Sequence, residues 1–289
     1  MYLDNAASTP VRAVAIDAMM PMLTESYGNP SGAHRMARDA RRRIDDARDI
    51  LAAGLGCAPG EIVFTAGGTE ADNLAVFGTH AEHGGTVVCS AVEHPAVLAP
   101  VEQLGGVVAP VDSRGLVDLD ALAELLDPTV SLVSVMLVNN ETGVVQCLDD
   151  IAELVHRRAP DAVIHTDAVQ AFPWLDVASL AEPADLISIA SHKFGGPKGV
   201  GALVVRDRVT LKAQAVGGGQ ERELRSGTHN AAGIVGMAAA AEELLAERSD
   251  VVGRVGVLRD RLADGLLAAV PDTIETAMQP GAAADRSGK

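Results

Sequence analysis

Aromatic side chains and long apolar runs are both scarce in this chain of 289 residues. Only seven residues are Phe, Tyr or Trp, although 48% of the chain is hydrophobic. The core must therefore be built mainly from Ala, Val, Leu and Ile, and the length is enough for two domains. No apolar run approaches membrane-spanning length, and residues 1–5 lack the basic flank and apolar stretch of a signal peptide. We expect a cytoplasmic protein that does not act at a membrane.

Cysteine is also scarce. Cys57, Cys89 and Cys147 are odd in number and widely spaced, which is typical of reduced thiols and gives no zinc-binding spacing. His80 and His83 have the spacing of a metal-binding pair, but no third ligand is near them in the sequence. We therefore expect no metal site.

Basic residues are few. The chain has 23 Lys and Arg against 39 Asp and Glu, which gives a formal net charge of −16. Such a field repels phosphate backbones and argues against a nucleic-acid partner. In the one arginine-rich segment, residues 35–48, aspartates alternate with the arginines at helical spacing, as in Arg41 and Asp45. This segment predicts a solvated helix face.

Lysine is the rarest charged residue, with four lysines against nineteen arginines. One of them, Lys193, comes shortly after the apolar run 185–190 and stands between His192 and a glycine-rich turn. A lysine at the end of a buried strand can be partly desolvated, which lowers its pKa and makes the amine nucleophilic. Lys193 is therefore a candidate Schiff-base lysine, and the alternative is a lysine that merely ends a strand.

Short β-rich runs alternate with helical stretches through the middle of the chain. Most of the seven runs carry few charges, as strands covered on both faces do, at residues 61–65, 86–90, 107–111, 131–137, 162–166, 185–190 and 200–205. Helical stretches fit between most of them, at residues 69–77, 95–104, 119–126 and 149–158. We predict an α/β fold with a seven-stranded, mainly parallel sheet flanked by helices.

The end of this pattern differs from its middle. Only a short glycine-rich turn joins the last two predicted strands, so we expect that pair to be antiparallel. After Gly227 the pattern becomes helical and predicts two long helices, at residues 231–248 and 251–269.

Ligands of a doubly wound sheet bind beyond the carboxyl ends of its strands, so the residues at those ends matter most. The turn ending in Gly68 and Thr69 leads into a helix and would point backbone N–H groups at an anion. His94 follows the second strand, and the polar turn 139–143, which contains Asn140, follows the fourth. Each feature has an ordinary alternative, namely a helix cap, a packing histidine or a tight turn.

Asp167 lies at the end of the fifth strand. A carboxylate there can pair with a ring nitrogen and keep it protonated, as an electron sink requires, although an aspartate can also simply cap the next helix. A phosphate-binding turn, a stacking histidine, an amide turn, a ring-nitrogen partner and a lysine thus follow in order, each at a strand end. Together they predict a site for pyridoxal 5'-phosphate.

With these residues the chain resembles the cysteine desulfurases, a branch of the class V aminotransferase group with the fold-type I architecture of pyridoxal-phosphate enzymes. The resemblance runs from residue 2 to about residue 269, through the segments 2–10, 28–31, 64–73, 93–94, 138–145, 165–170, 191–201, 217–222 and 225–228. It implies a homodimer that converts L-cysteine and an enzyme thiol into L-alanine and an enzyme persulfide. The sulfur would pass to an acceptor or scaffold protein, for iron–sulfur cluster assembly or thiolation.

The resemblance also implies a role for each matching residue around the cofactor ring. Lys193 would hold the cofactor as a Schiff base and move protons at the substrate Cα. His94 would stack on the ring and act as an acid–base group, Asp167 would pair with the ring nitrogen, and Gln170 would contact the ring hydroxyl.

Further roles are implied at the two ends of the site. The phosphate would be held by Gly68, Thr69 and His192, with Thr228 reaching it from the other subunit. The substrate would be bound by Asn140 and Asn5.

The chain departs from the family pattern at two places. Ala190 stands where many relatives have a phosphate-binding serine, and Ser191 need not point the same way on a strand of period two. The pattern fades after Pro271, whereas relatives continue with a catalytic cysteine and an arginine that binds the substrate carboxylate. We therefore expect an N-terminal segment (1–12), a large cofactor-binding domain (13–245) and an incomplete small domain (246–289) that ends in a disordered tail.

Three functions stay open on the sequence. The chain is a shortened cysteine desulfurase, which is inactive if the cysteine segment is needed, or another class V lyase or aminotransferase, or a catalytically silent partner subunit. Cys147 is the cysteine nearest to the expected pocket, and we expect it to be structural or incidental.

Overall fold

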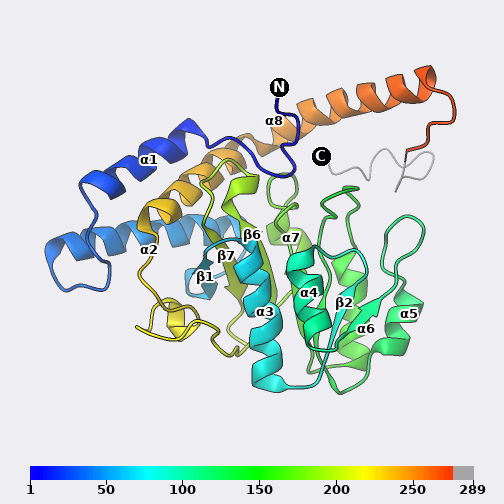
Figure 1. Ribbon diagram of the computed structural model, residues 1–289, viewed down its shortest axis with the longest axis horizontal. Coiled ribbons are helices and arrows are strands. Elements are labelled where there is room, and N and C mark those ends of the chain that lie inside the picture. The colour runs from blue at the N-terminus through cyan, green and yellow to red at the C-terminus, as the bar shows by residue number, and fades with distance from the viewer. Residues whose placement is uncertain (276–289) are drawn as a thin grey trace.

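One seven-stranded sheet organises the computed structural model, which describes residues 1–275 (Figure 1). Its strands are β1 (Ile62–Thr65), β2 (Thr86–Ser90), β3 (Val107–Ala109), β4 (Val130–Ser134), β5 (Val163–Asp167), β6 (Leu186–Ala190) and β7 (Gly201–Val205). They lie in the order β1-β7-β6-β5-β4-β2-β3. β7 is antiparallel to both β1 and β6, and the other neighbouring pairs are parallel. The predicted fold class and the antiparallel last pair are confirmed.

Helices precede the first strand, fill most connections between strands and follow the last strand. They are α1 (Ala13–Thr24), α2 (Arg35–Leu55), α3 (Gly68–His83), α4 (Pro95–Gln103), α5 (Leu119–Leu125), α6 (Leu148–Arg158), α7 (Val177–Leu180) and α8 (Ala231–Ala269), with short 3₁₀ turns η1 (Pro59–Glu61), η2 (Ser191–Lys193) and η3 (Glu221–Glu223). The pattern predicted α3, α4, α5 and α6 correctly and missed α1 and α7. The solvated arginine-rich helix is confirmed, since Arg41 and Asp45 form an exposed ion pair on α2 at 3.3 Å.

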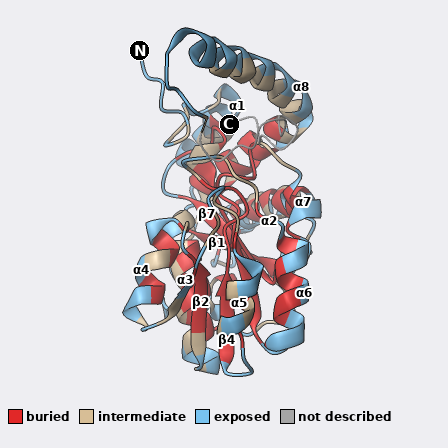
Figure 2. Ribbon diagram, turned by 90° about the vertical axis from the view of Figure 1, so that its right-hand side faces the viewer, coloured by how far each residue is buried: buried red, intermediate tan, exposed pale blue. Residues whose placement is uncertain are grey.

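Each face of the sheet has its own apolar core, which Figure 2 shows as the buried centre of the molecule. Alternate residues of one strand point to opposite faces, so Val163 packs under α3 and α4 while Ile164 packs with α2, α5 and α6. Aliphatic residues dominate both cores, as the low aromatic content requires. The C-terminal ends of the parallel strands meet at one edge between these two layers.

The prediction of two C-terminal helices is wrong, because α8 is one continuous helix of 39 residues. The residues between the two predicted segments, Ser249 and Asp250, include no proline and therefore do not interrupt the ladder of backbone hydrogen bonds. The predicted domain boundary after residue 245 falls inside this helix and stays a prediction. The predicted disordered tail, from Met278, lies outside the described residues.

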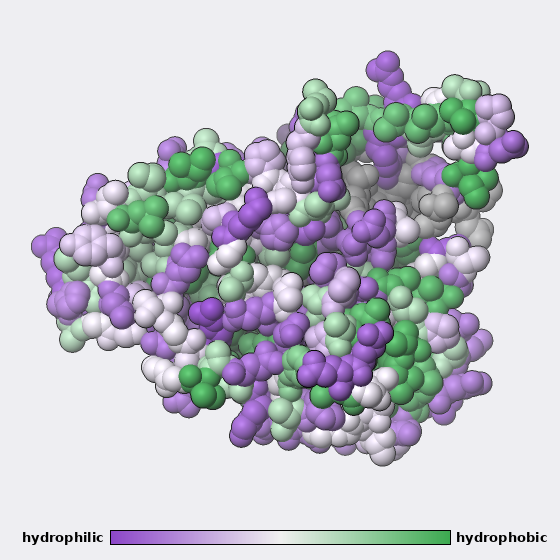
Figure 3. Space-filling view, in the orientation of Figure 1, coloured by the Kyte–Doolittle hydropathy of each residue, from purple (hydrophilic) through white to green (hydrophobic). Residues whose placement is uncertain are grey.

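The first half of α8 packs against α1 and α2. Gly236 permits the close approach to α1, since a Cβ on it would lie 2.6 Å from the Met19 side chain. Apolar side chains are exposed on α1 and on the far end of α8, where Figure 3 shows green surface, among them Ile16, Met20 and Leu262. No helix within residues 1–275 has the length and apolar character needed to cross a membrane.

Candidate active site

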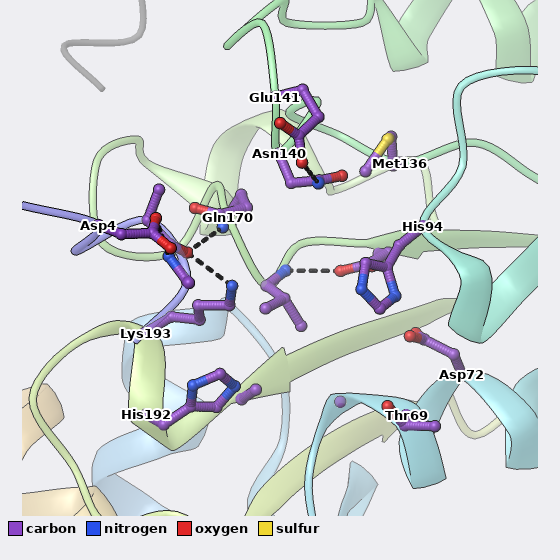
Figure 4. A pocket seen from close by; sticks show the side chains of 16 residues that line it. Asp4, Thr69, Asp72, His94, Met136, Asn140, Glu141, Gln170, His192 and Lys193 are labelled. Atoms are coloured by element: carbon purple, nitrogen blue, oxygen red, sulfur yellow. Dashed lines mark hydrogen bonds between the residues drawn. The ribbon is translucent and has the colours of Figure 1, made fainter. Parts of the chain in front are cut away.

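A cavity of about 520 Å³ opens at the C-terminal ends of the parallel strands (Figure 4), where a doubly wound sheet binds its ligands. Its walls come from the N-terminal segment, the start of α3, and the turns that follow β2, β4, β5 and β6. The structure brings together most of the predicted site residues in this one cavity: Gly68, Thr69, His94, Asn140, Asp167, Gln170, His192 and Lys193.

Lys193 ends η2, directly after β6, and its amine points into the cavity. The Nζ atom donates a hydrogen bond of 2.7 Å to the carbonyl oxygen of Ala6. Partial burial lowers the pKa of Lys193, and the negative charges of Asp167, Asp4 and Glu141 oppose that change. The structure thus supplies the partly desolvated amine that a nucleophilic lysine requires.

Asp167 ends β5 and is buried at the edge of the sheet. Its Oδ1 accepts a hydrogen bond from the backbone N–H of Val169 at 2.8 Å. Burial raises the pKa of Asp167, whereas the Val169 N–H, the His94 imidazole and the Lys193 amine favour its ionised form. The carboxylate can therefore pair with a cationic group that enters the cavity.

His94 caps the N-terminus of α4 and stands across the cavity from Lys193 (Figure 4). Its Nδ1 accepts a hydrogen bond of 3.1 Å from the backbone N–H of Ala96. Pro95 at the first helical position suits this cap, because its fixed φ favours the helix and it has no N–H to satisfy. The cap leaves Nε2 as the nitrogen that can exchange a proton with a ligand.

The N-terminal segment forms part of the wall. Gln170 donates a hydrogen bond of 2.8 Å to the carbonyl oxygen of Ala6, the atom that also accepts from Lys193. Thr9 fastens this segment to the loop that carries the lysine, because its backbone N–H and its hydroxyl both donate to the His192 carbonyl at 2.9 Å. The segment and the loop are therefore held as one unit.

The turn predicted to bind an anion lies at the end of the cavity where α3 begins. Thr69 stands in the first turn of α3, one residue after Gly68, and a Cβ on Gly68 would lie only 3.0 Å from the Val169 side chain. Burial, together with the charges of Lys193 and Lys198, lowers the pKa of His192 beside this turn. A second hollow of about 720 Å³ adjoins this end and is lined by Lys198.

Two further sequence expectations meet the structure here. Ala190 lines the cavity, whereas Ser191 does not, and a Cβ on Gly196 would lie 1.9 Å from the Ser191 hydroxyl. Ser191 thus points toward Gly196, in agreement with the expected departure from the family pattern.

The two asparagines of the amide turn after β4 have different roles. Asn139 is buried and builds the turn, because its Oδ1 accepts from the backbone N–H groups of Glu141 and Thr142 at 3.0 and 2.9 Å. Asn140 faces the cavity and donates to Glu141 at 2.8 Å.

Two predicted residues lie outside the cavity wall of this single chain. Asn5 is exposed, although its neighbours Asp4 and Ala6 both line the cavity. Thr228 is exposed on the loop that follows η3. Their roles stay predictions.

The three cysteines, all within the described chain, lie outside the cavity wall. Cys57 is half-buried before η1, Cys89 is buried in β2, and Cys147 is exposed at the start of α6. A hydrogen bond with Asp150 contributes most to the raised pKa of Cys147, which works against thiolate formation. In residues 1–275, His, Cys, Asp and Glu form no group of three or more that could hold a metal ion.

Sequence reasoning missed several residues of the wall, among them Asp4, Asp72, Met136 and Glu141. The sequence could have indicated Glu141, because it lies in the polar turn 139–143 that was predicted to reach the site. Asp72 gives none, because it lies inside a helix and reaches the cavity only through the packing of α3 on the sheet.

Comparison with known proteins agrees with this geometry. The sequence model for class V aminotransferases matches residues 1–271. A cysteine desulfurase of Cereibacter sphaeroides is 45% identical over 280 residues, which cover 94% of this chain and 71% of that protein. The chain belongs to the cysteine desulfurases of the class V aminotransferase family. An IscS-like cysteine desulfurase of Mycobacterium tuberculosis is 43% identical over 94% of this chain and 72% of that protein.

Solved structures of this family have the same fold. A NifS-like protein superposes with a TM-score of 0.90 at 36% identity, covering 96% of this chain and 80% of that one. A structure of SspA in complex with cysteine gives a TM-score of 0.78 at 39% identity, covering 83% of this chain and 72% of that one. Cysteine desulfurases and class V aminotransferases are pyridoxal-phosphate-dependent families.

The residues present fit that cofactor. The cavity has the size of a small-molecule site, and it combines one amine, two imidazoles and a buried carboxylate with the opening turn of a helix. Gly68 provides the cradle at that turn, since a Cβ there would crowd Val169. A planar ring carrying a cationic nitrogen and a phosphate therefore finds a complementary group at each end of the cavity.

Proposed function

We propose that this chain is a pyridoxal-phosphate-dependent cysteine desulfurase. The observation that carries the proposal is the meeting of Lys193, His94, Asp167 and Gln170 in one cavity. These residues come from three different strand ends, since Asp167 and Gln170 follow one strand and His94 and Lys193 follow two others, so their meeting is a property of the fold. The kinship with cysteine desulfurases selects the reaction among those that such a cavity can support.

Each residue has a defined task in this proposal. The cofactor, when bound, supplies an electron sink that stabilises a carbanion at the substrate Cα. Asp167 pairs with the ring nitrogen and Gln170 contacts the ring hydroxyl. Lys193 holds the cofactor and transfers protons at the substrate Cα, because its amine has a pKa lowered by burial and points into the cavity. His94 stacks on the ring from the opposite wall and exchanges protons through Nε2.

The remaining groups bind the two ends of the ligands. Gly68, Thr69 and His192 hold the phosphate, and Asn140 and Asn5 hold the substrate. The net reaction transfers the sulfur of L-cysteine to an acceptor thiol, which leaves L-alanine and a persulfide. An acceptor or scaffold protein takes the sulfur onward, in the cytoplasm, for iron–sulfur cluster assembly or thiolation.

A homodimer completes the site in this proposal, with Thr228 of one subunit reaching the phosphate of the other. The exposed apolar face of α1 supports an interface, because Ile16, Met20 and Leu23 are 48%, 49% and 59% exposed, and clustered apolar surface marks sites of association.

The test supplies the chain with pyridoxal phosphate, L-cysteine and dithiothreitol as the acceptor thiol, and measures alanine, sulfide and pyruvate. We expect a visible absorption band from the bound cofactor, and equal amounts of alanine and sulfide. Lys193→Ala removes the band and the turnover. The matched control Lys212→Ala, which replaces an exposed lysine outside the cavity wall, keeps both.

The products separate the alternatives. Pyruvate in place of alanine identifies a lyase and contradicts the proposal. A lysine-dependent band without any turnover leaves the cofactor site intact but refutes desulfurase activity, and it favours a silent partner subunit.

A further inference from the structure

An aspartate that the proposed reaction does not use lines the same cavity. Asp72 lies on α3, is 1% exposed and faces the sheet. Within residues 1–275 its Oδ1 has no hydrogen-bond partner, and the imidazole Nε2 of His165 lies 3.6 Å from it. A buried carboxylate normally requires a cation or several donors, so this placement needs an explanation.

A chain of hydrogen bonds leads from Asp72 into the sheet. His165 on β5 contacts the Ser134 hydroxyl at 2.8 Å through Nδ1 and the Ser188 hydroxyl at 3.0 Å through Nε2. Ser188 also bonds Asp72. Burial lowers the pKa of His165 to about 3, so the imidazole is neutral. His165 therefore supplies no positive charge to Asp72.

Two more buried carboxyl groups share this region. Burial raises the pKa of Glu93, which follows β2, to about 8. Burial first, and then the like charges of Asp167 and Glu93, raises the pKa of Asp72 well above its ordinary value, while the Ser188 hydroxyl opposes this. Each of these buried carboxyl groups therefore opposes the ionisation of its neighbours.

Asp167 is the member best equipped to carry a charge. His94 and Lys193 favour its ionised form and Val169 donates a backbone N–H to it, whereas within residues 1–275 the donor to Asp72 is the Ser188 hydroxyl alone. The other titratable group on the strands beneath α3 is Cys89, whose pKa burial raises to about 12, so it is neutral as well.

We propose that Asp72 is a protonated, neutral acid that acts as a positioning residue and leaves the negative charge of the cluster on Asp167. The positioning role rests on the proposed function, because a single carboxylate at this edge defines where a protonated ring nitrogen binds. The protonation state itself is a property of the chain without its cofactor.

Infrared spectroscopy of the chain without cofactor tests that state directly. We expect a carboxylic-acid C=O band at neutral pH that Asp72→Asn weakens. In Asp167→Asn, the Asp72 part of the band should disappear at a lower pH than in the unmodified chain, because the like-charged neighbour is gone. An unchanged band in Asp72→Asn overturns the proposal.

Thermal unfolding gives an independent readout. A native Asp72 that keeps its proton binds one proton more than the unfolded chain does above its ordinary pKa of 3.8, so the unmodified chain loses stability as pH rises. Asp72→Asn lacks this loss, so its Tm relative to the unmodified chain should rise by about 2–4 °C per pH unit between about pH 5 and pH 7. The matched control Asp161→Asn, at an exposed position, should show a constant difference.

A constant difference for Asp72→Asn shows an ionised Asp72 and overturns the proposal. Because neither experiment contains pyridoxal phosphate or L-cysteine, a failed desulfurase assay and a failed protonation assignment are separate results.

Discussion

Replacing Glu221 with glutamine tests how the loop before α8 is held. Glu221 opens η3 and its side chain is 2% exposed. Arg48 on α2 donates two hydrogen bonds to its carboxylate, at 2.7 and 3.0 Å. The backbone N–H of Phe64 donates to the same carboxylate at 2.8 Å, and the His229 Nε2 lies 2.7 Å from it. The three residues of η3 have φ values of 47°, 57° and 66°, a left-handed conformation that is costly for residues other than glycine.

The loss of stability expected for Glu221→Gln follows from the pKa of Glu221. Burial alone would raise this pKa, but the hydrogen bonds from His229 and Arg48, the charge of Arg48 and the Phe64 N–H lower it from 4.5 to about 2. At about 1.4 kcal/mol for each unit of pKa, the charged carboxylate contributes about 3 kcal/mol at neutral pH. This agrees with the 3–5 kcal/mol typical of breaking a buried ion pair.

The pH dependence has a defined sign. A depressed carboxylate pKa gives stability that is present above the unfolded value of 4.5 and is lost as pH falls toward about 2. Urea unfolding should therefore show Glu221→Gln about 3 kcal/mol less stable than the unmodified chain near pH 7. The deficit should shrink near pH 3, because the unmodified chain has by then lost part of the same contribution.

The control is Glu153→Gln, which breaks an exposed pair with Arg157 on α6 and should change the free energy of unfolding by no more than about 0.5 kcal/mol. A Glu221→Gln deficit below about 1 kcal/mol, or one that is equal at both pH values, would refute the reasoning.

Three more changes test the lysine loop and the cysteines. Thr9→Val should cost about 1–3 kcal/mol in urea unfolding and raise the pyridoxal phosphate concentration needed for half-maximal visible absorbance, because the hydroxyl bridges the His192 carbonyl and the Gly195 N–H. Thr24→Val, whose hydroxyl bonds only an exposed carbonyl of α1, is its control, and an equal effect in both would contradict the role of the bridge. Gly196→Ala should lower the free energy of unfolding by about 1–3 kcal/mol, because the new Cβ overlaps the Ser191 hydroxyl. Adding Ser191→Ala to that variant should restore part of the lost stability. No restoration would mean that the backbone, and not the hydroxyl, is the obstacle. Cys147→Ala should leave sulfide release from L-cysteine unchanged, because Cys147 lies outside the cavity wall, and a loss of sulfide would identify it as the acceptor.

The sheet and most of the cavity could be predicted because their signals are local. Strands buried on both faces are continuous apolar runs, and the rule that ligands bind at strand ends then selects Gly68, His94, Asp167 and Lys193 without any knowledge of side-chain contacts. Helix α1 was missed because it follows Pro10 without a side-chain cap. Helix α8 was divided in two because the polar residues at its middle resemble a turn, although no helix-breaking residue stands there.

The charge state of the cavity edge could not be predicted, because it depends on contacts between distant segments. Asp72 stands within a helix that contains other polar residues, and an exposed aspartate there would be an ordinary carboxylate. Only the packing of α3 over β5 and β6 places it beside His165, Ser188 and Asp167. Burial with a neutral imidazole then removes the cation that would keep Asp72 ionised. A chain with a net charge of −16 thus places several acids around one cavity, and the fold decides which of them carries the charge that a cationic ring requires.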